Sequence, residues 1–184
     1  MFGARAGRGA AAFAKANPTV SANAVREGAH AAQTRIRELF VREAGSETVS
    51  GLRQAMHATI ESGAGIYRSD TLLQETCRVL VDLRQRYDKV QLQDRSNVFN
   101  TDLIQVLELG CMLEVAEAIA HSAARRKESR GSHQRLDHPE RDDGNYLKHS
   151  LATYRGGGVP TVSYCDVVIT RSKPAARVYG GAAA

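Results

Sequence analysis

The strongest constraint on the fold is a long segment, residues 101–127, that is apolar nearly all round from Leu103 to Ala120. Asn100 precedes it and can cap a helix there, because its side-chain oxygen accepts a hydrogen bond from a free N–H group of the first turn. A helix without a polar face has to be covered on all sides. The segment is therefore predicted to be the buried centre of a helical bundle.

Three amphipathic segments before it supply the covering helices. Residues 21–43 carry apolar side chains near helical spacing and predict a helix, which Gly45-Ser46 ends. Ser46 is the expected N-cap of the next helix. The run Gly63-Ala64-Gly65 ends that second helix. Its apolar stripe consists of Val49, Leu52, Met56 and Ile60. A third helix begins near Ser69-Asp70, with an apolar seam whose steps of three and four suit packing at a shallow angle. The seam comprises Leu72, Thr76, Val79, Leu83, Tyr87 and Val90.

The N-terminal segment, Met1 to Arg26, contains no acidic residue. An arginine-rich, acid-poor start is typical of an organelle transit peptide. Phe2–Lys15 can equally be an alanine-rich helix that stops before Asn17-Pro18, where helical geometry is disfavoured. Composition favours the plain helix.

After Lys127 the pattern changes. Residues Glu128–Asn145 have neither a helical nor an alternating period, and a long irregular stretch is typical of functional or docked loops. Two β-rich runs follow, Lys148–Tyr154 and Thr161–Thr170, and the glycines between them predict a hairpin. A lone hairpin is marginal in water, so it should lie on the bundle or on another domain. The expected fold class is mainly α: an antiparallel three- to four-helix bundle, spectrin-repeat-like, followed by an irregular loop and a small C-terminal β-hairpin.

Chemistry-bearing motifs are sparse. The spacing of Gly3, Gly7 and Gly9 is not that of a dinucleotide-binding turn, and no nucleophile elbow, paired-histidine zinc motif or phosphate-binding loop occurs in the sequence. Cys111 and Met112 are expected to fill the core, and Cys165 lacks a neighbouring base. Several histidines and aspartates match no common metal-ligand spacing, so a polar surface explains them better. They are His121, His133, His138, His149, Asp137, Asp142 and Asp143.

The net charge of +5 is modest, and the basic residues between 125 and 141 alternate with acidic ones. No aromatic residue lies between Phe99 and Tyr146 to stack on a base, so nucleic-acid binding is not expected. The mixed signs favour arginine–carboxylate pairs that hold the loop in one conformation, with Arg130 and Arg135 as donors. A role for these two at the border of an active site is the alternative. No apolar stretch approaches the ~18 residues that a membrane span requires.

A set of motifs runs in order through nearly the whole chain. The motifs are Gly65-Ile66-Tyr67-Arg68, Val98–Leu103, Ala124–Asp137, Arg141–Asp143 with Asn145, Leu147–His149, Tyr164 with Asp166-Val167, Ile169-Thr170 and Arg177–Gly181. Together they resemble the C-terminal part of the flavoprotein subunit of fumarate reductase and succinate dehydrogenase, most closely the bacterial quinol:fumarate reductase kind. L-aspartate oxidase is similar around Ser129-Arg130-Gly131 but fits the final residues less well.

The resemblance implies a division of labour. In that family the FAD-binding fold, the histidine that carries the flavin, the cap domain and the dicarboxylate-binding segment all precede this region. The catalytic and flavin-contacting residues would therefore lie upstream of Met1, and none is assigned in this chain. Fumarate reduction needs hydride from a reduced flavin and a positioned acid. The chain alone is expected neither to bind FAD nor to turn over substrate, and no metal site is expected.

The resemblance also implies domains and partners. Residues 1–16 would be the end of a flavin-domain helix, residues 17–127 the helical bundle domain, and residues 128–184 the irregular loop, hairpin and tail. Five loop residues are candidates for an interdomain border: Arg130, Gly131, His133, Arg135 and Asp137. Expected partners are the flavin-binding domain, an iron–sulfur subunit and membrane anchor subunits, which would place the chain in the cytoplasm at the inner face of the plasma membrane. A free-standing helical interaction module and the equivalent domain of L-aspartate oxidase are the alternatives.

Overall fold

The computed structural model describes residues 2–18, 21–43, 45–154, 156, 158–172 and 174–175. Its helices, in chain order, are α1 (Phe2–Ala16), α2 (Ala22–Val41), α3 (Val49–Ala64), α4 (Asp70–Tyr87), α5 (Thr101–Arg125) and the short α6 (Asp143–Tyr146). Its strands are β1 (Tyr67–Arg68), β2 (Gln134–Arg135), β3 (Lys148–Thr153) and β4 (Thr161–Asp166). The predicted mainly helical fold with a small hairpin is confirmed. The motif at 177–181 lies outside the described residues.

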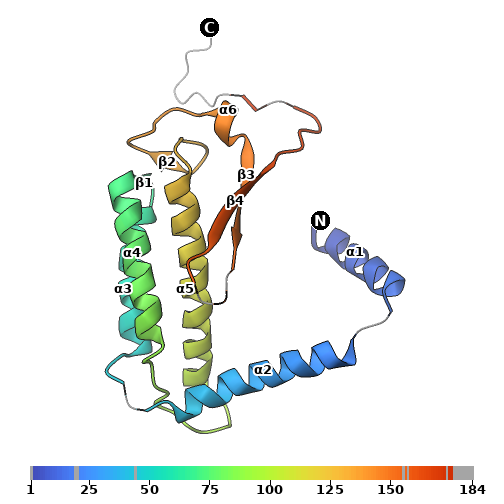
Figure 1. Ribbon diagram of the computed structural model, residues 1–184, viewed down its shortest axis with the longest axis vertical. Coiled ribbons are helices and arrows are strands. Elements are labelled where there is room, and N and C mark those ends of the chain that lie inside the picture. The colour runs from blue at the N-terminus through green and yellow to red at the C-terminus, as the bar shows by residue number, and fades with distance from the viewer. Residues whose placement is uncertain are drawn as a thin grey trace.

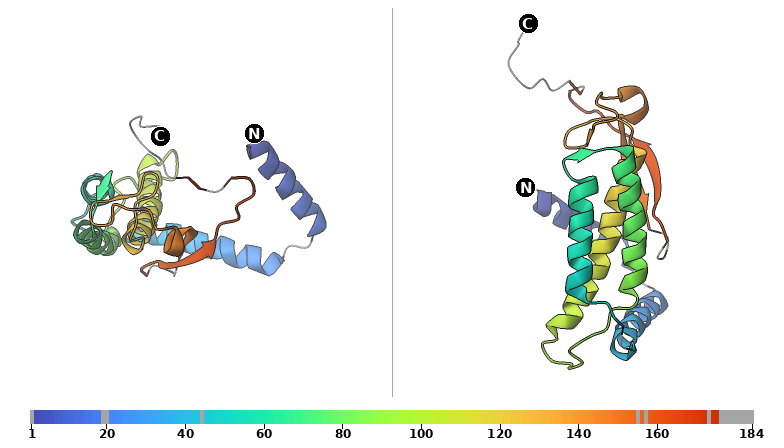
Figure 2. Two further views of the ribbon diagram at one scale, coloured as in Figure 1. Left: turned by 90° about the horizontal axis from the view of Figure 1, so that it is seen from above. Right: turned by 90° about the vertical axis from the view of Figure 1, so that its left-hand side faces the viewer.

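Helices α3, α4 and α5 form the bundle, in which α4 runs antiparallel to both α3 and α5 (Figure 1). The view from above shows these three helices gathered together, with α2 leading away from them to α1 (Figure 2). Leucines without exposed surface fill the space between the three helices, among them Leu52, Leu73, Leu80 and Leu113. Burial of such side chains contributes roughly 1.5–3 kcal/mol each, so the bundle contains most of the hydrophobic stabilisation.

Two sequence expectations about these helices are corrected. The N-cap of α3 is Thr48 rather than Ser46; its hydroxyl accepts from the Gly51 N–H. The expected seam of α4 is correct in part: Thr76, Leu83 and Val90 are buried and Val79 and Tyr87 pack against the core, but the buried face also extends to a neighbouring stripe. Leu72 is exposed, and the buried side chains are Leu73, Thr76, Cys77, Leu80 and Leu83.

Helix α5 has one apolar side that the described residues leave uncovered. Its N-cap is Asn100, as predicted. Helices α3 and α4 cover it on one side and strand β3 on another, but Ile104, Val115 and Ile119 remain 53%, 58% and 46% exposed. The expectation that α5 is buried all round is therefore wrong for the part of the chain that the structure describes, since α3, α4 and the hairpin β3–β4 leave one side of the helix open.

Strands β3 and β4 form the predicted antiparallel hairpin, with Lys148 opposite Asp166 and Thr153 opposite Thr161. The hairpin lies along α5 and buries Val162, which confirms that it is supported by the bundle (Figure 1). Strand β4 ends at Asp166 rather than Thr170, and Arg155 and Gly157 of the connecting turn lie outside the described residues. The irregular stretch after α5 contains β2, which pairs in parallel with β1, and α6.

The bundle makes a close helix contact at Gly63 that can be tested. A Cβ atom at this position would overlap Thr76 Oγ1 and lie 3.0 Å from the Leu72 carbonyl oxygen. We expect Gly63→Ala to lower the free energy of unfolding by about 1–3 kcal/mol, because a crowded core has to shift to accept the methyl group. Gly28→Ala is the matched control: it lies in exposed α2 with open space around it, and should be neutral or stabilising. Urea unfolding monitored by circular dichroism would contradict the expectation if both variants behaved alike.

Candidate functional site

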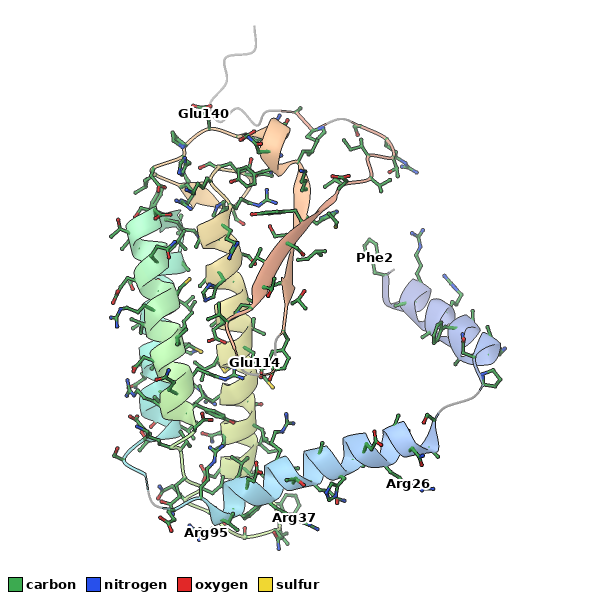
Figure 3. The ribbon with its side chains drawn as sticks, viewed as in Figure 1. Phe2, Arg26, Arg37, Arg95, Glu114 and Glu140 are labelled. Carbon is green, nitrogen blue, oxygen red and sulfur yellow. The ribbon has the colours of Figure 1, made fainter. Side chains whose placement is uncertain are left out.

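The loop between α5 and β3 lies across the end of the bundle, over the beginning of α4 and the end of α5 (Figure 1). Two charged residues in it, Glu128 and Arg135, have no exposed surface. Figure 3 shows Glu140 at the outer end of the same loop, away from the helices. Charged side chains are almost never fully buried unless they are paired. The loop is therefore built around two ion-pair networks, one at each buried charge.

The first network centres on the Glu128 carboxylate. It accepts hydrogen bonds from Arg126 Nη1, from Arg130 Nε at 2.9 Å and Nη2 at 2.9 Å, and from the Asp142 N–H at 2.9 Å. Burial by itself raises the pKa of Glu128, but these donors more than offset it, so its pKa lies below the ordinary value. Arg130 also bonds to Asp143 Oδ1 at 2.7 Å. Glu128 thereby joins the end of α5 to the start of α6.

The second network centres on the Arg135 guanidinium. It binds both carboxylate oxygens of Asp137, from Nε at 2.8 Å and from Nη2 at 2.7 Å. Its Nη1 lies 3.4 Å from the carbonyl oxygens of Ala123, Ala124 and Arg126 at the end of α5. A cation is favoured at that end of a helix, where carbonyls lack intrahelical partners.

Asp137 makes the complementary contact with α4. Its Oδ2 accepts from the N–H of Asp70, the first residue of that helix, at 2.9 Å. Hydrogen bonding by Arg135, followed by that N–H, holds the pKa of Asp137 well below its usual range. A carboxylate at a helix N-terminus and a cation at a helix C-terminus both stabilise the local dipoles. The Arg135–Asp137 pair thus ties the N-terminus of α4 to the C-terminus of α5.

His133 lies between these networks. Its Nδ1 is 2.8 Å from Arg68 Nη1 and its Nε2 is 3.0 Å from the Arg126 carbonyl oxygen. A guanidinium can only donate, so Nδ1 is the acceptor and carries no proton, and Nε2–H donates to the carbonyl. The ring is therefore neutral in this arrangement. Gly131, two residues before His133, has φ +60°, a left-handed conformation that glycine adopts without strain.

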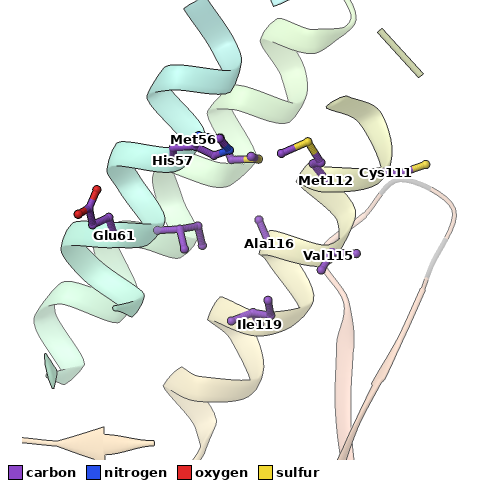
Figure 4. A pocket seen from close by; sticks show the side chains of 9 residues that line it. Met56, His57, Glu61, Cys111, Met112, Val115, Ala116 and Ile119 are labelled. Carbon is purple, nitrogen blue, oxygen red and sulfur yellow. The ribbon is translucent and has the colours of Figure 1, made fainter. Parts of the chain in front are cut away.

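Two open grooves flank these elements. A polar groove of about 820 Å³ runs along the outer side of the loop and is lined by Arg130, Gly131, His133, Arg135 and Arg141 among others. An apolar groove of about 630 Å³ lies between α3 and α5. Figure 4 shows Met56 on α3 and Met112 on α5 pointing toward each other in the apolar groove, with Val115 and Ile119 further along α5.

Comparison with known proteins identifies the family. Residues 53–179 match the family described as the fumarate reductase flavoprotein C-terminus. The chain belongs to this family. The fumarate reductase flavoprotein subunit of Haemophilus influenzae is 45% identical over 183 residues, which is 100% of this chain and 30% of that subunit. The chain thus spans about 30% of the length of this curated relative.

Solved structures agree with the sequence comparison. A structure of E. coli quinol fumarate reductase matches with a TM-score of 0.84 and 45% identity, over 90% of this chain and 28% of the matched one. The apo Sdh1 complex of Mycobacterium smegmatis matches with a TM-score of 0.74 and 30% identity, over 89% of this chain and 27% of the matched one. The chain therefore corresponds to the C-terminal domain of fumarate reductase and succinate dehydrogenase flavoproteins, and the recognition of this family from its motifs is confirmed.

The structure brings together the loop residues that the sequence singled out in this fumarate reductase domain. Predicted ion pairing is confirmed for Arg130, with Glu128 and Asp143, and for Arg135, with Asp137. Sequence reasoning missed Arg68 and the Asp70 N–H as partners of the loop. They lie more than 60 residues away along the chain, and no local pattern connects them to it. Glu128 could have been found, because arginines lie two residues to either side of it.

The cysteine expectation for this domain is corrected in part. Cys111 is exposed, and Figure 4 shows it directed away from α3, so it is not core filler, whereas Met112 is half-buried and packs against the core. Cys165 is exposed on β4, and Cys77 is the buried cysteine. Burial raises the pKa of the Cys77 thiol to about 11, so it stays protonated at neutral pH.

The residues present do not by themselves fit the FAD that the family name implies. Each sheet among the described residues has two strands, and no glycine-rich turn there joins a strand to a helix N-terminus as a dinucleotide cradle requires. The guanidinium groups of Arg130 and Arg135 already hold carboxylates. The described residues also contain no cluster of three or more His, Cys, Asp or Glu side chains arranged for a metal, and none of their helices is long and apolar enough to cross a bilayer.

Proposed function

We propose that this chain acts as the structural C-terminal domain of a flavoprotein subunit that interconverts fumarate and succinate, and that it supports the flavin-bearing domain rather than carrying out chemistry. One observation carries the proposal: the whole chain aligns with about 30% of a fumarate reductase flavoprotein subunit, so about 70% of such a subunit lies outside the match. The groups that the redox reaction needs, a flavin and a positioned acid, belong to that remainder.

The rigid loop is the first part of the proposed interface. Arg130, Gly131, His133, Arg135 and Asp137 form the interdomain border in this proposal. Their inner atoms are fixed by the Glu128 and Arg135 networks, while their outer side borders the polar groove. A surface held in one conformation before docking loses little entropy when a second domain covers it. The buried ion pairs would thus lower the entropy cost of docking by fixing the loop beforehand.

The second part of the interface is apolar. No residue of α1 is buried, and Leu39 is the buried residue of α2. Phe2 and Phe13 of α1 are 81% and 70% exposed. A helix of this length is marginal in water without a packing partner. We propose that the flavin-bearing remainder covers α1, α2 and the apolar groove between α3 and α5.

Domains, cofactor and partners follow from the same proposal. Residues 1–16 would complete the flavin domain, residues 17–127 would form the helical domain, and residues 128–184 the loop, hairpin and tail. FAD would be bound by the remainder of the subunit. An iron–sulfur subunit and membrane anchor subunits would be the further partners, and they would hold the subunit in the cytoplasm at the inner face of the plasma membrane.

A chimeric enzyme tests the proposal. The matched segment of the E. coli quinol fumarate reductase flavoprotein subunit is replaced by this chain, and fumarate reduction with a reduced viologen dye is measured together with bound flavin. We expect an active, flavin-loaded complex. Ile119→Lys, which places a charge in the apolar groove, should reduce assembly and activity; Leu72→Lys, at an exposed apolar position on α4, should not. An inactive chimera, or equal effects of both lysines, would count against the proposal.

The isolated chain provides the complementary measurement. We expect it to be colourless after purification and inactive with fumarate and reduced dye, because the redox group would belong to the remainder. Circular dichroism of the isolated Ile119→Lys variant checks that the bundle is still folded. Stoichiometric flavin on the isolated chain would contradict the proposed division between the two domains.

A further inference from the structure

The imidazole of His133 makes two contacts, and the one through Nδ1 requires the neutral ring. Nδ1 accepts from Arg68 Nη1 at 2.8 Å, and Nε2–H donates to the Arg126 carbonyl at 3.0 Å. Arg68 is held in place by its own Nε, which donates to the Gly65 carbonyl at 2.8 Å. If Nδ1 were protonated, two N–H donors and two positive charges, those of His133 and Arg68, would face each other across that 2.8 Å contact. The second contact would survive protonation, but the first cannot.

The charges around this ring come from every element packed against it, and they are cations. Arg68 lies on β1, Arg135 lies on β2, and Arg126 is the residue that follows α5. The nearby carboxylates are committed elsewhere, Glu128 to Arg126 and Arg130, and Asp137 to Arg135. Burial lowers the pKa of His133; the Arg126 carbonyl opposes this as an acceptor, and the surrounding arginines lower the pKa further.

We propose that His133 is an acid-sensitive latch: the neutral ring holds the turn Arg130–His133 against β1 and the end of α5, and protonation releases that turn. The Arg130 guanidinium stays bound to Glu128 and Asp143, so the part of the turn that is released is Gly131–His133. Arg130 and His133 exchange two backbone hydrogen bonds, of 2.8 and 3.0 Å, and Gly131 between them is exposed. This inference depends on contacts within the chain and does not require the proposed function.

The direction of the effect follows from linkage. The pKa of His133 is lowered in the folded protein, so the unfolded or opened state binds the proton more tightly. The stabilisation from the latch is present above the ordinary histidine value of about 6.5 and is lost as the pH falls through the folded-state pKa. The opening should be local, because the Arg135–Asp137 pair and the Leu136 N–H bond to the Arg68 carbonyl, at 2.8 Å, do not involve the ring.

Nuclear magnetic resonance of the full chain tests the latch. We expect the His133 ring to be the Nε2–H tautomer at pH 7.5 and to titrate below the ordinary histidine value of about 6.5. Amide exchange at Arg130 and His133, corrected for the intrinsic pH dependence, should become severalfold faster between pH 7.5 and 5, since one unit of pKa difference corresponds to a tenfold change in the opening equilibrium. The Ser129 amide, which donates to the Glu140 carbonyl at 2.9 Å away from the ring, is the internal reference.

Two variants separate the latch from a general effect of acid. His133→Gln keeps a donor and an acceptor but cannot titrate, and should abolish the extra pH dependence. His138→Gln removes the neighbouring histidine, whose side chain is 39% exposed, and should leave the pH dependence unchanged. A His133 that titrates at or above the ordinary histidine value of about 6.5, an Nδ1–H tautomer, or the same acid-induced exchange in His133→Gln would overturn the proposal. The tautomer and titration are read on the unmodified chain, so the test does not depend on a variant that folds.

Discussion

Glu128→Gln is expected to lower the free energy of unfolding by about 3–5 kcal/mol, the usual loss when one partner of a buried ion pair is removed. The substitution preserves the volume but leaves Arg126 and Arg130 without the carboxylate that neutralises them, in a site with no exposed surface on the Glu128 side. Urea unfolding at pH 7, monitored by circular dichroism, measures the change. Glu140→Gln is the matched control, because Glu140 is an exposed glutamate of the same loop.

The pH dependence of this loss provides a second check. The pKa of Glu128 is lowered in the folded state, so its contribution is present above the ordinary glutamate value of about 4.3 and is lost as the pH falls through the folded-state pKa. The unfolding curves of the unmodified chain and of Glu128→Gln should therefore converge in acid. If the two differ by the same amount from pH 7 down to strong acid, the charge of Glu128 is not what stabilises the loop.

Periodicity predicted the parts of this fold that local sequence controls. Helix α5 and its cap at Asn100, the start of α4 after Ser69, and the hairpin β3–β4 all follow from patterns within a few residues. Periodicity did not predict which face of a helix is buried where that depends on the elements packed against the helix. The buried stripe of α4 and the exposed side of α5 are decided by the neighbours of each helix, and those neighbours are not encoded in its own spacing.

The candidate site divides in the same way. Alternating charges between 125 and 143 predicted arginine–carboxylate pairs, and the structure contains them. The contacts with β1 and α4 could not be predicted, because Arg68 and Asp70 meet the loop only after α3, α4 and α5 have assembled. For the same reason the complete burial of Glu128 and Arg135, which makes them sensitive to substitution, could not be predicted from local patterns.

Substitutions of Arg135 test whether its positive charge or its planar, bidentate guanidinium holds the loop. Arg135→Met should lower the free energy of unfolding by about 1–3 kcal/mol, since the carbonyls at the end of α5 lose a buried donor and Asp137 loses its ion pair. Arg135→Lys keeps the charge but cannot bind both oxygens of Asp137 while also reaching α5, so it should retain only part of the stability. Arg78→Met, which removes an exposed arginine of α4, is the matched control and should leave the urea midpoint unchanged.

The double variant Arg135→Met/Asp137→Asn decides between the two descriptions. If the pair acts as a unit, the double variant should lose less stability than the sum of the two single losses. The reason is that it leaves no charge without its partner. Amide exchange near residues 123–126 should then show whether the C-terminus of α5 still loosens, as expected when its cation is gone. Additive losses, or a lysine that replaces the arginine fully, would mean that Arg135 acts as a point charge and not as the planar connection between α4 and α5.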